Sequence, residues 1–445
     1  MSDGGILPRI MILSHYWYPE NGVPQRRWEW LSHVLADSGH EVFAIVPPPH
    51  YKRNYSFKAR AREFVHSFSP IFEVGPARET CIRTSFIRGG YSLTSKATNQ
   101  IWSAFSSVRV ALQLRLCRSF PAPELVLGTV PALPTSFASY AVARIFRTPH
   151  ILDLRDAWPE LLENSESWNA STGNPSIREK LLAGWPLQAS KKVAELGLNY
   201  VIKHSEGVIV TTDFHRRDII RRYKLPSSRV ITVRNVFPPA FSKEDRHQSN
   251  LLETKEYTKT PSLNILYAGT VGRAQNLSNA LQALRICHDH GVDARLRIIG
   301  AGAAKKQLSI EADRMALPVE ILGKVLPQDL EKHYQWADTA LVHLTDWAPL
   351  EKAVPSKTFE LMALGIHISA AVRGETADLI TELGAGQVVP PEDPKALATL
   401  WESIAQNPQM RHVTAKAKEW VAQEYTARGP QRFIKLIQEV LREKQ

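Results

Sequence analysis

The sequence predicts an α/β fold built from two Rossmann-like, doubly wound domains. The chain has 445 residues, which is more than one ordinary hydrophobic core accommodates. Short apolar runs alternate with longer segments of helical periodicity, a pattern typical of parallel sheets that are covered by helices on both faces. This alternation occurs in two series, which are separated by a stretch rich in Pro, Ser, Thr and charge at residues 236–262.

The first series opens with an apolar run, a loop containing Pro, Asn and Gly, and a helix that ends at Gly39. Its expected strands are residues 9–17, 41–48, 125–130, 150–154, 207–212 and 230–235. The second series has expected strands at residues 263–269, 295–300, 319–323, 339–344 and 367–372. We therefore expect an N-terminal domain at residues 1–240, a linker at 241–262, a C-terminal domain at 263–410, and a helical segment at 411–445 that packs back on the N-terminal domain. Ligands of such sheets bind at the carboxyl ends of the strands.

Charge is distributed unevenly along the chain. Residues 1–250 hold 32 Lys+Arg and 21 Asp+Glu, a net charge of +11, whereas the remaining residues hold 23 of each. The segment at residues 51–64 mixes five basic side chains with four aromatic ones. Such a surface suits an anionic membrane. Nucleic acid is a second candidate partner, and a solvated basic face without a partner is the third interpretation.

The cysteines and the start of the chain favour a cytoplasmic protein. Cys81, Cys117 and Cys287 form neither a CxxC pair nor a metal-ligand spacing, which fits a reduced compartment. The first residues lack the basic and long apolar regions of a secretory signal. The uncharged run at residues 125–143 contains two prolines, so we do not expect it to span a membrane.

Two glycine turns follow expected strands of the second series. In YAGTVGRAQNL, Gly269 and Gly272 come after a strand and Arg273 leads into a helix. Glycines let backbone N–H groups approach an anion, a helix start adds favourable partial charge, and an arginine can bind a diphosphate through two hydrogen bonds. A plain tight turn explains these glycines equally well, and also those at residues 298–302. The chain has no GxxxxGK[ST] loop and no GxGxxG after its first strand.

The segment AVPSKTFELMALG at residues 353–365 predicts a mostly buried helix that carries one carboxylate. Ser356 is expected to cap this helix and Gly365 to end it. Lys357 then lies in the first turn, where the helix macrodipole disfavours a cation unless an anion also binds there. Glu360 lies one turn later, where its carboxylate can accept hydrogen bonds from sugar hydroxyls. A buried ion pair of Glu360 with Lys357 or with an arginine is the alternative.

Taken in order, these motifs resemble a retaining glycosyltransferase of the GT-B fold, in family 4 and its branch that assembles bacterial surface polysaccharides. The resemblance covers nearly the whole chain and is carried by residues 16–42, 153–160, 267–277, 298–302, 322–325 and 354–365. It implies two domains that face each other across a cleft and a nucleotide-sugar donor, with UDP favoured as the carrier. It also implies a hydroxyl acceptor on a glycan or a polyprenyl-linked carrier.

The resemblance implies roles for individual residues of the donor site. Glu360 would hold the donor's ribose hydroxyls, and Arg273 would neutralise its diphosphate. Gly22 would lie in the N-terminal loop that approaches the phosphates. Gly323 and Lys324 fall where the family lines the nucleobase. The other expected donor-side residues are Gly269, Gly272 and Ser356.

This chain departs from the family pattern at three places. The position of the family's first glutamate is Lys352, with Glu351 one residue away. The lysine that often follows the phosphate-binding arginine by five residues is replaced by Ser278, so Lys357 is expected to supply the second cation. The strand-end histidine of the N-terminal domain is absent from LGTVPAL.

The expected chemistry is the departure of a nucleoside diphosphate with attack on the same face of the sugar. Arg273 and Lys357 would stabilise the leaving diphosphate, and the departing phosphate can take the acceptor's proton. Asp156, beside Arg155, would orient the acceptor hydroxyl, although a helix cap or an ion pair with Arg155 explains Asp156 equally well. Glu160 is a further acceptor-side candidate. No DxD triplet occurs, so neither a metal nor another cofactor is expected.

Two other classes fit part of the sequence. A sugar-nucleotide 2-epimerase shares the two-domain shape but leaves the basic, aromatic surface unexplained. A nucleic-acid-binding protein explains the charge, yet no RNP-like, zinc-finger or helix-turn-helix signature accompanies it. The sequence therefore favours the transferase without a nucleic-acid partner. Its basic N-terminal domain is expected to meet the inner, cytoplasmic face of the cell membrane.

Overall fold

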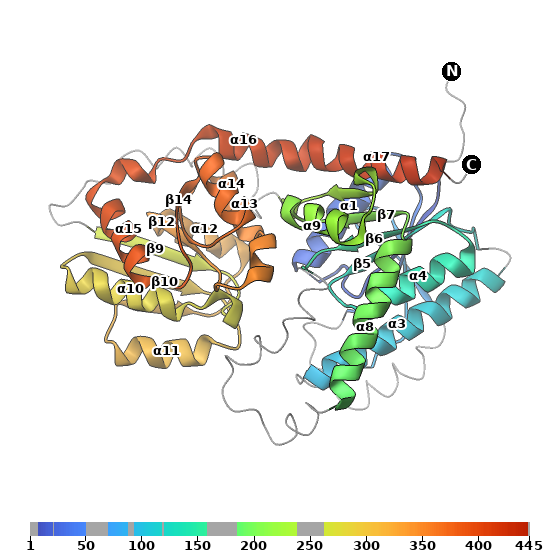
Figure 1. Ribbon diagram of the computed structural model, residues 1–445, viewed down its shortest axis with the longest axis horizontal. Helices are drawn as coiled ribbons and strands as arrows, with labels where there is room; N and C mark the ends of the chain where they lie inside the picture. Colours follow the sequence, from blue (N-terminus) through green and yellow to red (C-terminus); the bar gives the residue numbers. More distant parts are fainter. Residues whose placement is uncertain are drawn as a thin grey trace. The chain divides into compact units, whose positions relative to one another are not determined.

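The computed structural model describes residues 8–20, 22–49, 70–87, 93–117, 120–157, 185–237 and 262–443 (Figure 1). The chain forms two compact units. One comprises residues 1–235 together with 428–445, and the other comprises residues 236–427. Each unit is built around one mainly parallel sheet. The chain therefore has the two α/β domains that its sequence predicts.

The sheet of the first unit has eight described strands in the order β3-β4-β2-β1-β5-β6-β7-β8, and β3 pairs with β4 in antiparallel fashion. The strands are β1 (Ile10–Leu13), β2 (Val42–Val46), β3 (Ile71–Val74), β4 (Thr80–Arg83), β5 (Leu125–Val130), β6 (His150–Leu154), β7 (Gly207–Val210) and β8 (Val230–Thr232). The helices are α1 (Val23–Asp37), α3 (Leu93–Leu116), α4 (Pro134–Phe146), α8 (Trp185–His204), α9 (Asp213–Tyr223), the short η1 (Ser227–Arg229) and α17 (Gly429–Arg442).

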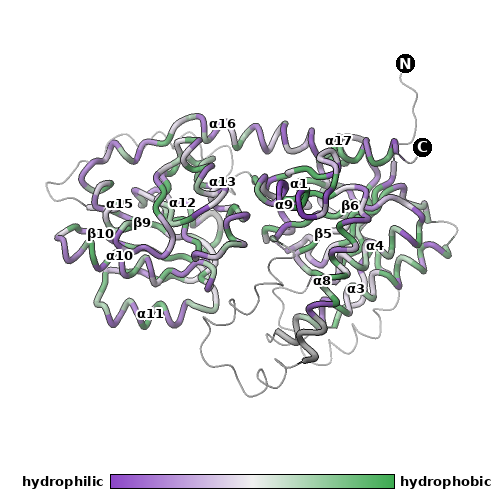
Figure 2. Tube along the Cα trace, viewed as in Figure 1, coloured by the Kyte–Doolittle hydropathy of each residue, from purple (hydrophilic) through white to green (hydrophobic). Residues whose placement is uncertain are grey.

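The central strands of this sheet are buried because helices cover both faces. Every residue of β1, β5 and β6 is buried, and Figure 2 shows the hydrophobic residues that these strands contribute. Apolar side chains of α3 and α4 pack against β1, β2 and β5. Those of α8 and α9 pack against β6 and β7 on the same face. Helix α17 covers the other face, where Leu436 lies near Gly207 and Ile151. A continuous apolar run such as LVLGTV is what a strand buried on both faces requires.

Helix α17 belongs to the first unit although it follows the second unit in the sequence. Its apolar side chains are buried, and it packs against β7, β8 and α1. Arg432 on α17 donates from Nε to the carbonyl of Thr232 at 2.8 Å. Helix α16 (Ala415–Gln423) packs instead on α13 of the second unit. Residues 411–445, expected as one segment, are therefore divided near the π-helical turn Glu424–Arg428.

The sheet of the second unit has six described strands, all parallel, in the order β11-β10-β9-β12-β13-β14. They are β9 (Ser262–Ala268), β10 (Asp293–Ile299), β11 (Val319–Leu322), β12 (Thr339–His343), β13 (Ile368–Ala371) and β14 (Gly386–Val389). The helices are η3 (Arg273–Gln275), α10 (Ser278–Asp289), α11 (Lys305–Arg314), α12 (Pro327–Trp336), η4 (Ala348–Lys352), α13 (Ser356–Leu364), α14 (Glu375–Glu382), α15 (Pro394–Gln406), η5 (Pro408–Arg411) and α16. Across the described residues of both units, no helix has the length and apolarity needed to cross a membrane.

Both sheets reverse their strand order at the first strand of the series. In the first unit β1 lies between β2 and β5, and in the second unit β9 lies between β10 and β12. Ligands of doubly wound sheets bind beyond the carboxyl ends of the strands at such a switch point. The loops that follow β9 and β12, and those at the carboxyl edge of the first sheet, are therefore the places to look for a site.

Candidate functional site

The loops after β9 and β10 meet through their glycines. Gly269 follows β9 with φ +153°, and Gly300 follows β10 with φ +156°. A Cβ atom on Gly300 would lie 1.8 Å from the carbonyl oxygen of Gly269, so glycine is required for this approach. The Gly269 N–H donates to the Ile299 carbonyl at 2.9 Å, and the Gly272 N–H donates to Gln275 Oε1 at 3.2 Å. The two N–H groups expected to approach an anion thus have partners within the unit.

The start of helix α13 differs from the prediction. Pro355 is the N-cap residue and no side chain caps the helix, so Ser356 is the first helical residue rather than the cap. The extended conformation of Pro355 (φ −58°, ψ 131°) lets its carbonyl accept the first hydrogen bond, from the Thr358 N–H at 2.9 Å. Gly365 ends the helix with φ +70°, the left-handed conformation that its position requires.

Lys357, in the first turn of α13, is half-buried as a residue, but its ammonium group is buried and has no hydrogen-bond partner among the described residues. Its Nζ lies 3.5 Å from the centroid of the Tyr267 ring. It also lies 3.8 Å from the position that a Cβ atom on Gly269 would occupy, which places it beside the carboxyl end of β9. Burial lowers the pKa of Lys357 to about 7. A cation in this setting, at the positive end of a helix, favours the binding of an anion.

The buried polar side chains around Lys357 are neutral at pH 7. The Tyr267 hydroxyl donates to the Thr270 carbonyl at 2.5 Å, and burial raises the pKa of Tyr267. His343, the last residue of β12, has its Nε2 at 2.8 Å from Asn279 Nδ2. Burial and then the charge of Lys357 lower the pKa of His343 to about 4. His343 was not among the predicted site residues. Its place at the end of an expected strand, where ligands of such sheets bind, could have identified it from the sequence.

Glu360 and Arg273 are both partly exposed. Arg273 opens the 3-10 turn η3 directly after Gly272, and Glu360 lies one turn after Lys357. Helix α13 is buried through neighbours such as Phe359, whereas Glu360 keeps access to solvent. Of the two alternative ion pairs of Glu360, with Lys357 or with an arginine, the first has no hydrogen bond, because the Lys357 ammonium has no hydrogen-bond partner among the described residues.

The remaining donor-side candidates lie in loops of the second unit. Gly323 and Lys324 are exposed after β11, and a Cβ atom on Gly323 would meet no atom within 4 Å. Glu351 is exposed and Lys352 partly exposed in η4. A Cβ atom on Gly374, which has φ +68°, would lie 2.2 Å from the Glu351 carbonyl oxygen. This close approach holds the main chain of η4 against the start of α14.

The candidates of the first unit lie at two places on its sheet. Gly22 is the N-cap residue of α1, which has no side-chain cap. Arg155 and Asp156 follow β6, and Arg155 is buried while Asp156 is exposed. Glu160 and the basic, aromatic segment at residues 51–64 lie outside the described residues. Within the described ranges, no group of three or more His, Cys, Asp or Glu side chains is placed to hold a metal ion.

The first unit also contains a buried ion pair that sequence reasoning missed. Arg27 on α1 and Asp153 on β6 are both fully buried, with Nη2 2.8 Å from Oδ1 and Nε 3.2 Å from Oδ2. Thr129 Oγ1 donates to the same carboxylate at 3.0 Å. Arg27 Nη1 donates to the Val233 carbonyl at 2.8 Å and to Asn235 Oδ1 at 3.1 Å. The pair thus ties α1 and β6 to the last residues of the first unit before the chain passes to the second.

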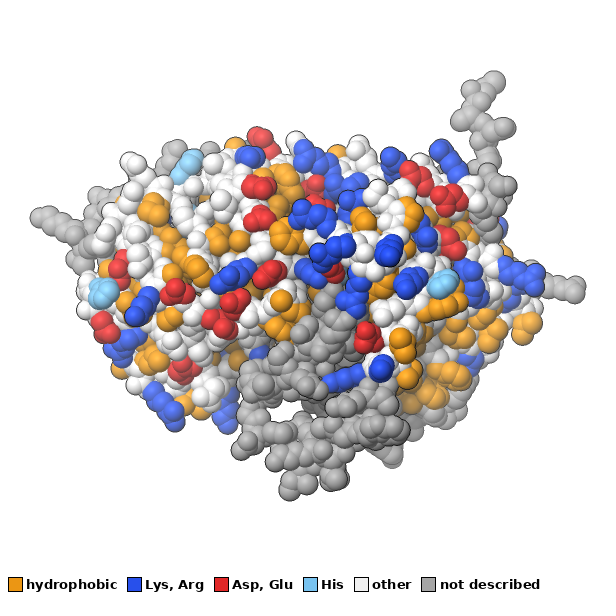
Figure 3. Space-filling view, viewed as in Figure 1, with side chains coloured by type: hydrophobic (Ala, Val, Ile, Leu, Met, Phe, Trp, Pro, Cys, Tyr) orange, Lys and Arg blue, Asp and Glu red, His pale blue; other side chains and the backbone are white. Residues whose placement is uncertain are grey.

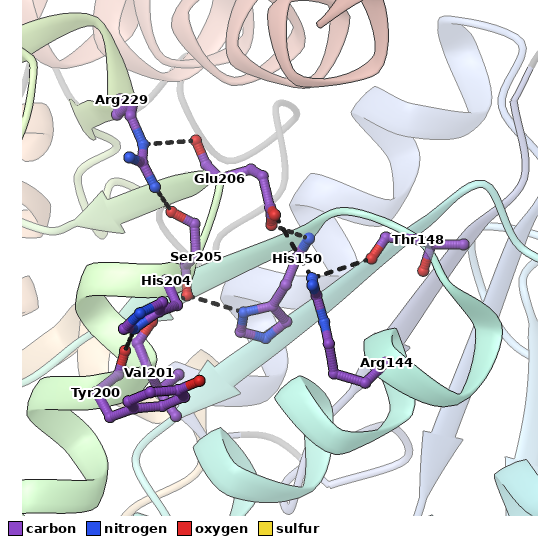
Figure 4. A network of polar contacts seen from close by, with 9 residues as sticks. All are labelled: Arg144, Thr148, His150, Tyr200, Val201, His204, Ser205, Glu206 and Arg229. Atoms are coloured by element: carbon purple, nitrogen blue, oxygen red, sulfur yellow. Dashed lines mark hydrogen bonds and ion pairs between the residues drawn. The ribbon is translucent and has the colours of Figure 1, made fainter. Parts of the chain in front are cut away.

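A second polar network lies at the opposite, amino edge of the first sheet (Figure 4). His150 begins β6, where its Nδ1 lies 2.9 Å from Ser205 Oγ and its main-chain N–H donates to Glu206 at 2.7 Å. Arg144 lies 3.5 Å from the same glutamate. Burial, with a smaller contribution from Arg144, lowers the pKa of His150 to about 3. Because ligands of this fold bind at the other edge, we interpret the network as structural.

Comparison with known proteins gives partial matches to glycosyltransferases. Residues 251–420 match the family described as "Glycosyl transferases group 1". The chain is similar to "Putative colanic acid biosynthesis glycosyltransferase WcaL" of Salmonella typhimurium, with 25% identity over 188 residues, 41% of this chain and 46% of that relative. It is also similar to "Probable glycosyltransferase WbjE" of Pseudomonas aeruginosa, with 32% identity over 145 residues, 32% of this chain and 35% of that relative. The matches span less than half the length of these relatives.

Solved structures share the fold over nearly the whole chain. Sucrose-phosphate synthase from Thermosynechococcus elongatus has a TM-score of 0.65 at 14% identity and covers 98% of this chain and 100% of its own. Anabaena HepE, in complex with UDP and glucose, has a TM-score of 0.61 at 12% identity and covers 97% and 99%. WaaG, a glycosyltransferase involved in lipopolysaccharide biosynthesis, has a TM-score of 0.55 at 13% identity and covers 95% and 98%. The chain therefore has the two-domain GT-B fold, and its second unit contains a region that matches the glycosyl transferases of group 1.

Proposed function

We propose that this protein is a retaining glycosyltransferase of family 4 that acts without a metal ion. It would move a sugar from a nucleoside-diphosphate sugar, with UDP the favoured carrier, to a hydroxyl of a glycan or polyprenyl-linked acceptor in the synthesis of cell-surface polysaccharide. The observation that carries the proposal is the buried, unpartnered ammonium of Lys357 at the switch point of the second sheet. The names of WcaL and WaaG support the polysaccharide setting, and the complex of HepE with UDP and glucose supports the carrier.

In the proposed reaction the bond between the sugar and the leaving phosphate breaks, and its electron pair stays on the phosphate oxygen. Lys357 and Arg273 would stabilise this developing charge, the kind of electrostatic contribution that is usually the largest in such transfers. The acceptor oxygen bonds to the same face of the sugar, and its proton passes to the departing phosphate. Asp156 would orient the acceptor hydroxyl. Two protein cations would supply the charge that a divalent ion supplies in other transferases.

The remaining proposed contacts to the donor follow if its diphosphate binds beside Lys357. Glu360 is one helical turn from Lys357 and reaches solvent, so its carboxylate can accept hydrogen bonds from the ribose hydroxyls. A diphosphate beside Lys357 would also stabilise the protonated amine. The other residues proposed to line the donor are Gly22, Gly269, Gly272, Gly323, Lys324 and Ser356, with Arg155 and Glu160 on the acceptor side.

The surface of the first unit supports association with an anionic membrane. Helix α3 carries no acidic side chain and has Arg109 and Arg115 among its basic ones. It exposes four large apolar side chains, between 45% and 82% accessible, whose spacing of four, seven and four residues places them on one stripe. These are Ile101, Phe105, Leu112 and Leu116. In Figure 3, hydrophobic side chains gather over the part of the first unit that α3 and α8 occupy. We propose that this stripe meets the inner face of the cell membrane, where a lipid-linked acceptor resides.

Thermal unfolding in the presence of UDP, GDP, ADP and dTDP tests the donor site first. At about 100 times its dissociation constant, a bound nucleotide should stabilise the native state by roughly 2.7 kcal/mol. We expect one nucleotide to stabilise the wild type but neither Lys357→Met nor Glu360→Ala. We also expect dUDP, which lacks the 2′-hydroxyl, to stabilise the wild type less than UDP does.

The absence of a shift with any nucleotide, or equal shifts in all three proteins, would overturn the donor-site assignment. Incubation with the sugar nucleotide alone distinguishes the transferase from a 2-epimerase. Only an epimerase would invert the configuration at C2 of the sugar without a second substrate. A transferase releases the nucleoside diphosphate in proportion to the acceptor consumed.

A further inference from the structure

Arg155 has a buried guanidinium, two of whose nitrogens lack a hydrogen-bond partner among the described residues. It follows β6 directly and is 9% exposed. Its Nε and Nη1 are both buried and have no hydrogen-bond partner. Among the described residues, no carboxylate forms an ion pair with it. Because an uncompensated buried charge costs several kcal/mol, a guanidinium with no carboxylate partner among the described residues is suited to bind an anionic ligand.

The carboxylates near Arg155 do not supply that partner. Asp153, two residues earlier, is engaged by Arg27 at 2.8 and 3.2 Å and by Thr129 at 3.0 Å. Asp156 is exposed as a residue, and its charge is near enough to raise the pKa of Arg155, but it forms no hydrogen bond with Nε or Nη1 of Arg155. Burial, followed by the positive charge of Arg27, lowers the pKa of Arg155 to about 10. The guanidinium is therefore still protonated at neutral pH, and its charge is not offset by a paired carboxylate.

The main chain of Arg155 is fixed at the edge of the sheet where ligands bind. Its carbonyl accepts a hydrogen bond from Thr211 Oγ1, in the loop after β7, at 3.1 Å. Tyr16, in the loop after β1, is near enough to contribute to the pKa of Arg155 by raising it. Arg155 therefore belongs to the carboxyl edge of the first sheet, among the loops of β1, β6 and β7, where doubly wound sheets bind their ligands.

We propose that Arg155 binds a phosphate or diphosphate ester of the acceptor, so that the acceptor is anionic where it meets the first unit. This rests on the proposed function, because it assumes that the donor diphosphate is held in the second unit beside Lys357. A guanidinium has two edges, each of which can donate two hydrogen bonds to a phosphate. Nε lies on one edge and Nη1 on the other, so each edge has a buried donor without a partner.

Calorimetric titration of pyrophosphate into the full chain, with the donor site saturated by UDP, tests the proposal. The wild type is expected to bind pyrophosphate under these conditions. Arg155→Gln should weaken this binding at least tenfold, and Arg155→Lys should weaken it less. Both variants should keep the UDP affinity of the wild type within about twofold. Lys357→Met should show the reverse, losing UDP and retaining pyrophosphate.

The outcomes separate this proposal from the proposed function. Equal pyrophosphate affinity in the wild type and Arg155→Gln would overturn the assignment of Arg155 to the acceptor. A loss of UDP binding in Arg155→Gln would overturn it as well, because the donor phosphates would then bind at Arg155. If no variant bound UDP while pyrophosphate binding still depended on Arg155, the proposed donor site would fail and the anion site would stand. Thermal unfolding controls for folding, because Arg155→Gln should melt at or above the wild-type temperature whereas Arg27→Gln should melt below it.

Discussion

The two sheets of the molecule share a switch in strand order but bury different cations at their carboxyl edges. In the second unit Lys357 lies against an aromatic ring, and its ammonium has no hydrogen-bond partner among the residues that the structure describes. In the first unit two buried nitrogens of Arg155 have no partner within the described part of the chain. Arg27, which is fully buried, is instead satisfied by Asp153 and by main-chain oxygens. Burial of a charge at a strand end therefore does not mark a ligand site by itself. The informative property is whether the protein supplies the partner.

The chemical type of each unpartnered cation adds a second difference. An amine can release its proton when it is buried, and the pKa of Lys357 falls to about 7. A guanidinium cannot do so at neutral pH. At pH 7 the second unit can thus hold Lys357 partly deprotonated until an anion binds, while Arg155 in the first unit keeps its positive charge. We expect the donor site, and not the Arg155 site, to titrate near pH 7.

Removing the satisfied pair should have the largest effect on stability. Asp153→Ala leaves Arg27 fully buried without its carboxylate, and we expect the free energy of unfolding to fall by about 3 to 5 kcal/mol. Urea denaturation followed by tryptophan fluorescence measures this loss. Glu124→Gln is the matched control, because it removes the pair of Arg9 and Glu124, whose side chains are 28% and 42% exposed, and should cost less than about 1 kcal/mol. Equal losses in the two variants would show that Arg27 does not depend on Asp153.

Removing Lys357 should raise the free energy of unfolding instead of lowering it. The unfolded chain keeps the Lys357 proton up to the usual pKa of 10.5, whereas the folded protein releases it above about 7. Between these values the unfolded state binds more protons, so stability rises with pH, and below about 7 the penalty is constant. Lys357→Met lacks this penalty. We expect it to be more stable than the wild type by on the order of 3 kcal/mol at pH 7 and by much less at pH 10.

Denaturation of both proteins in urea at pH 7 and pH 10 gives this difference. Lys305→Met is the control, because Lys305 in the same unit donates from Nζ to the Leu322 carbonyl at 2.9 Å and its removal should not stabilise the protein. A gain in Lys357→Met that is the same at both pH values would assign the effect to packing rather than to the buried charge.

Much of the fold could be predicted because the central strands are continuous apolar runs. The sequence analysis did not predict three short strands, β3, β4 and β14. All of β3 is exposed and all of β14 is half-buried, so neither needs a fully apolar run. Strand β4 is mostly buried, but its four residues include Arg83, whose charge interrupts the pattern. The edge strands β3 and β14, and the short inner strand β4, carry too little hydrophobic signal to be recognised from one sequence.

The candidate site could be predicted where a residue conflicts with its local structure. Lys357 was recognisable because a cation in the first turn of an apolar helix opposes the macrodipole. The partners of Arg27 and Asp153 could not be seen, because 126 residues separate them and the packing of α1 on β6 brings them together. Whether Arg155 has a carboxylate partner could not be predicted either, because Asp153, two residues away, is paired with Arg27 only in the folded protein.

The smallest expected effect is on membrane binding, which should depend on the apolar stripe of α3 in the first unit and not on the surface of the second unit. If the stripe on α3 meets a membrane, Arg109→Ser should weaken binding to anionic vesicles by about 1 kcal/mol, or roughly fivefold, and Phe105→Ser should weaken it further through the lost apolar contact. Co-sedimentation with vesicles that contain phosphatidylglycerol measures both. Ile310→Ser on α11 is the matched control, since Ile310 is 37% exposed on the second unit and should not contribute. If Phe105→Ser instead changes the oligomeric state in sedimentation velocity without changing vesicle binding, the stripe covers a second copy of the chain and the membrane assignment fails.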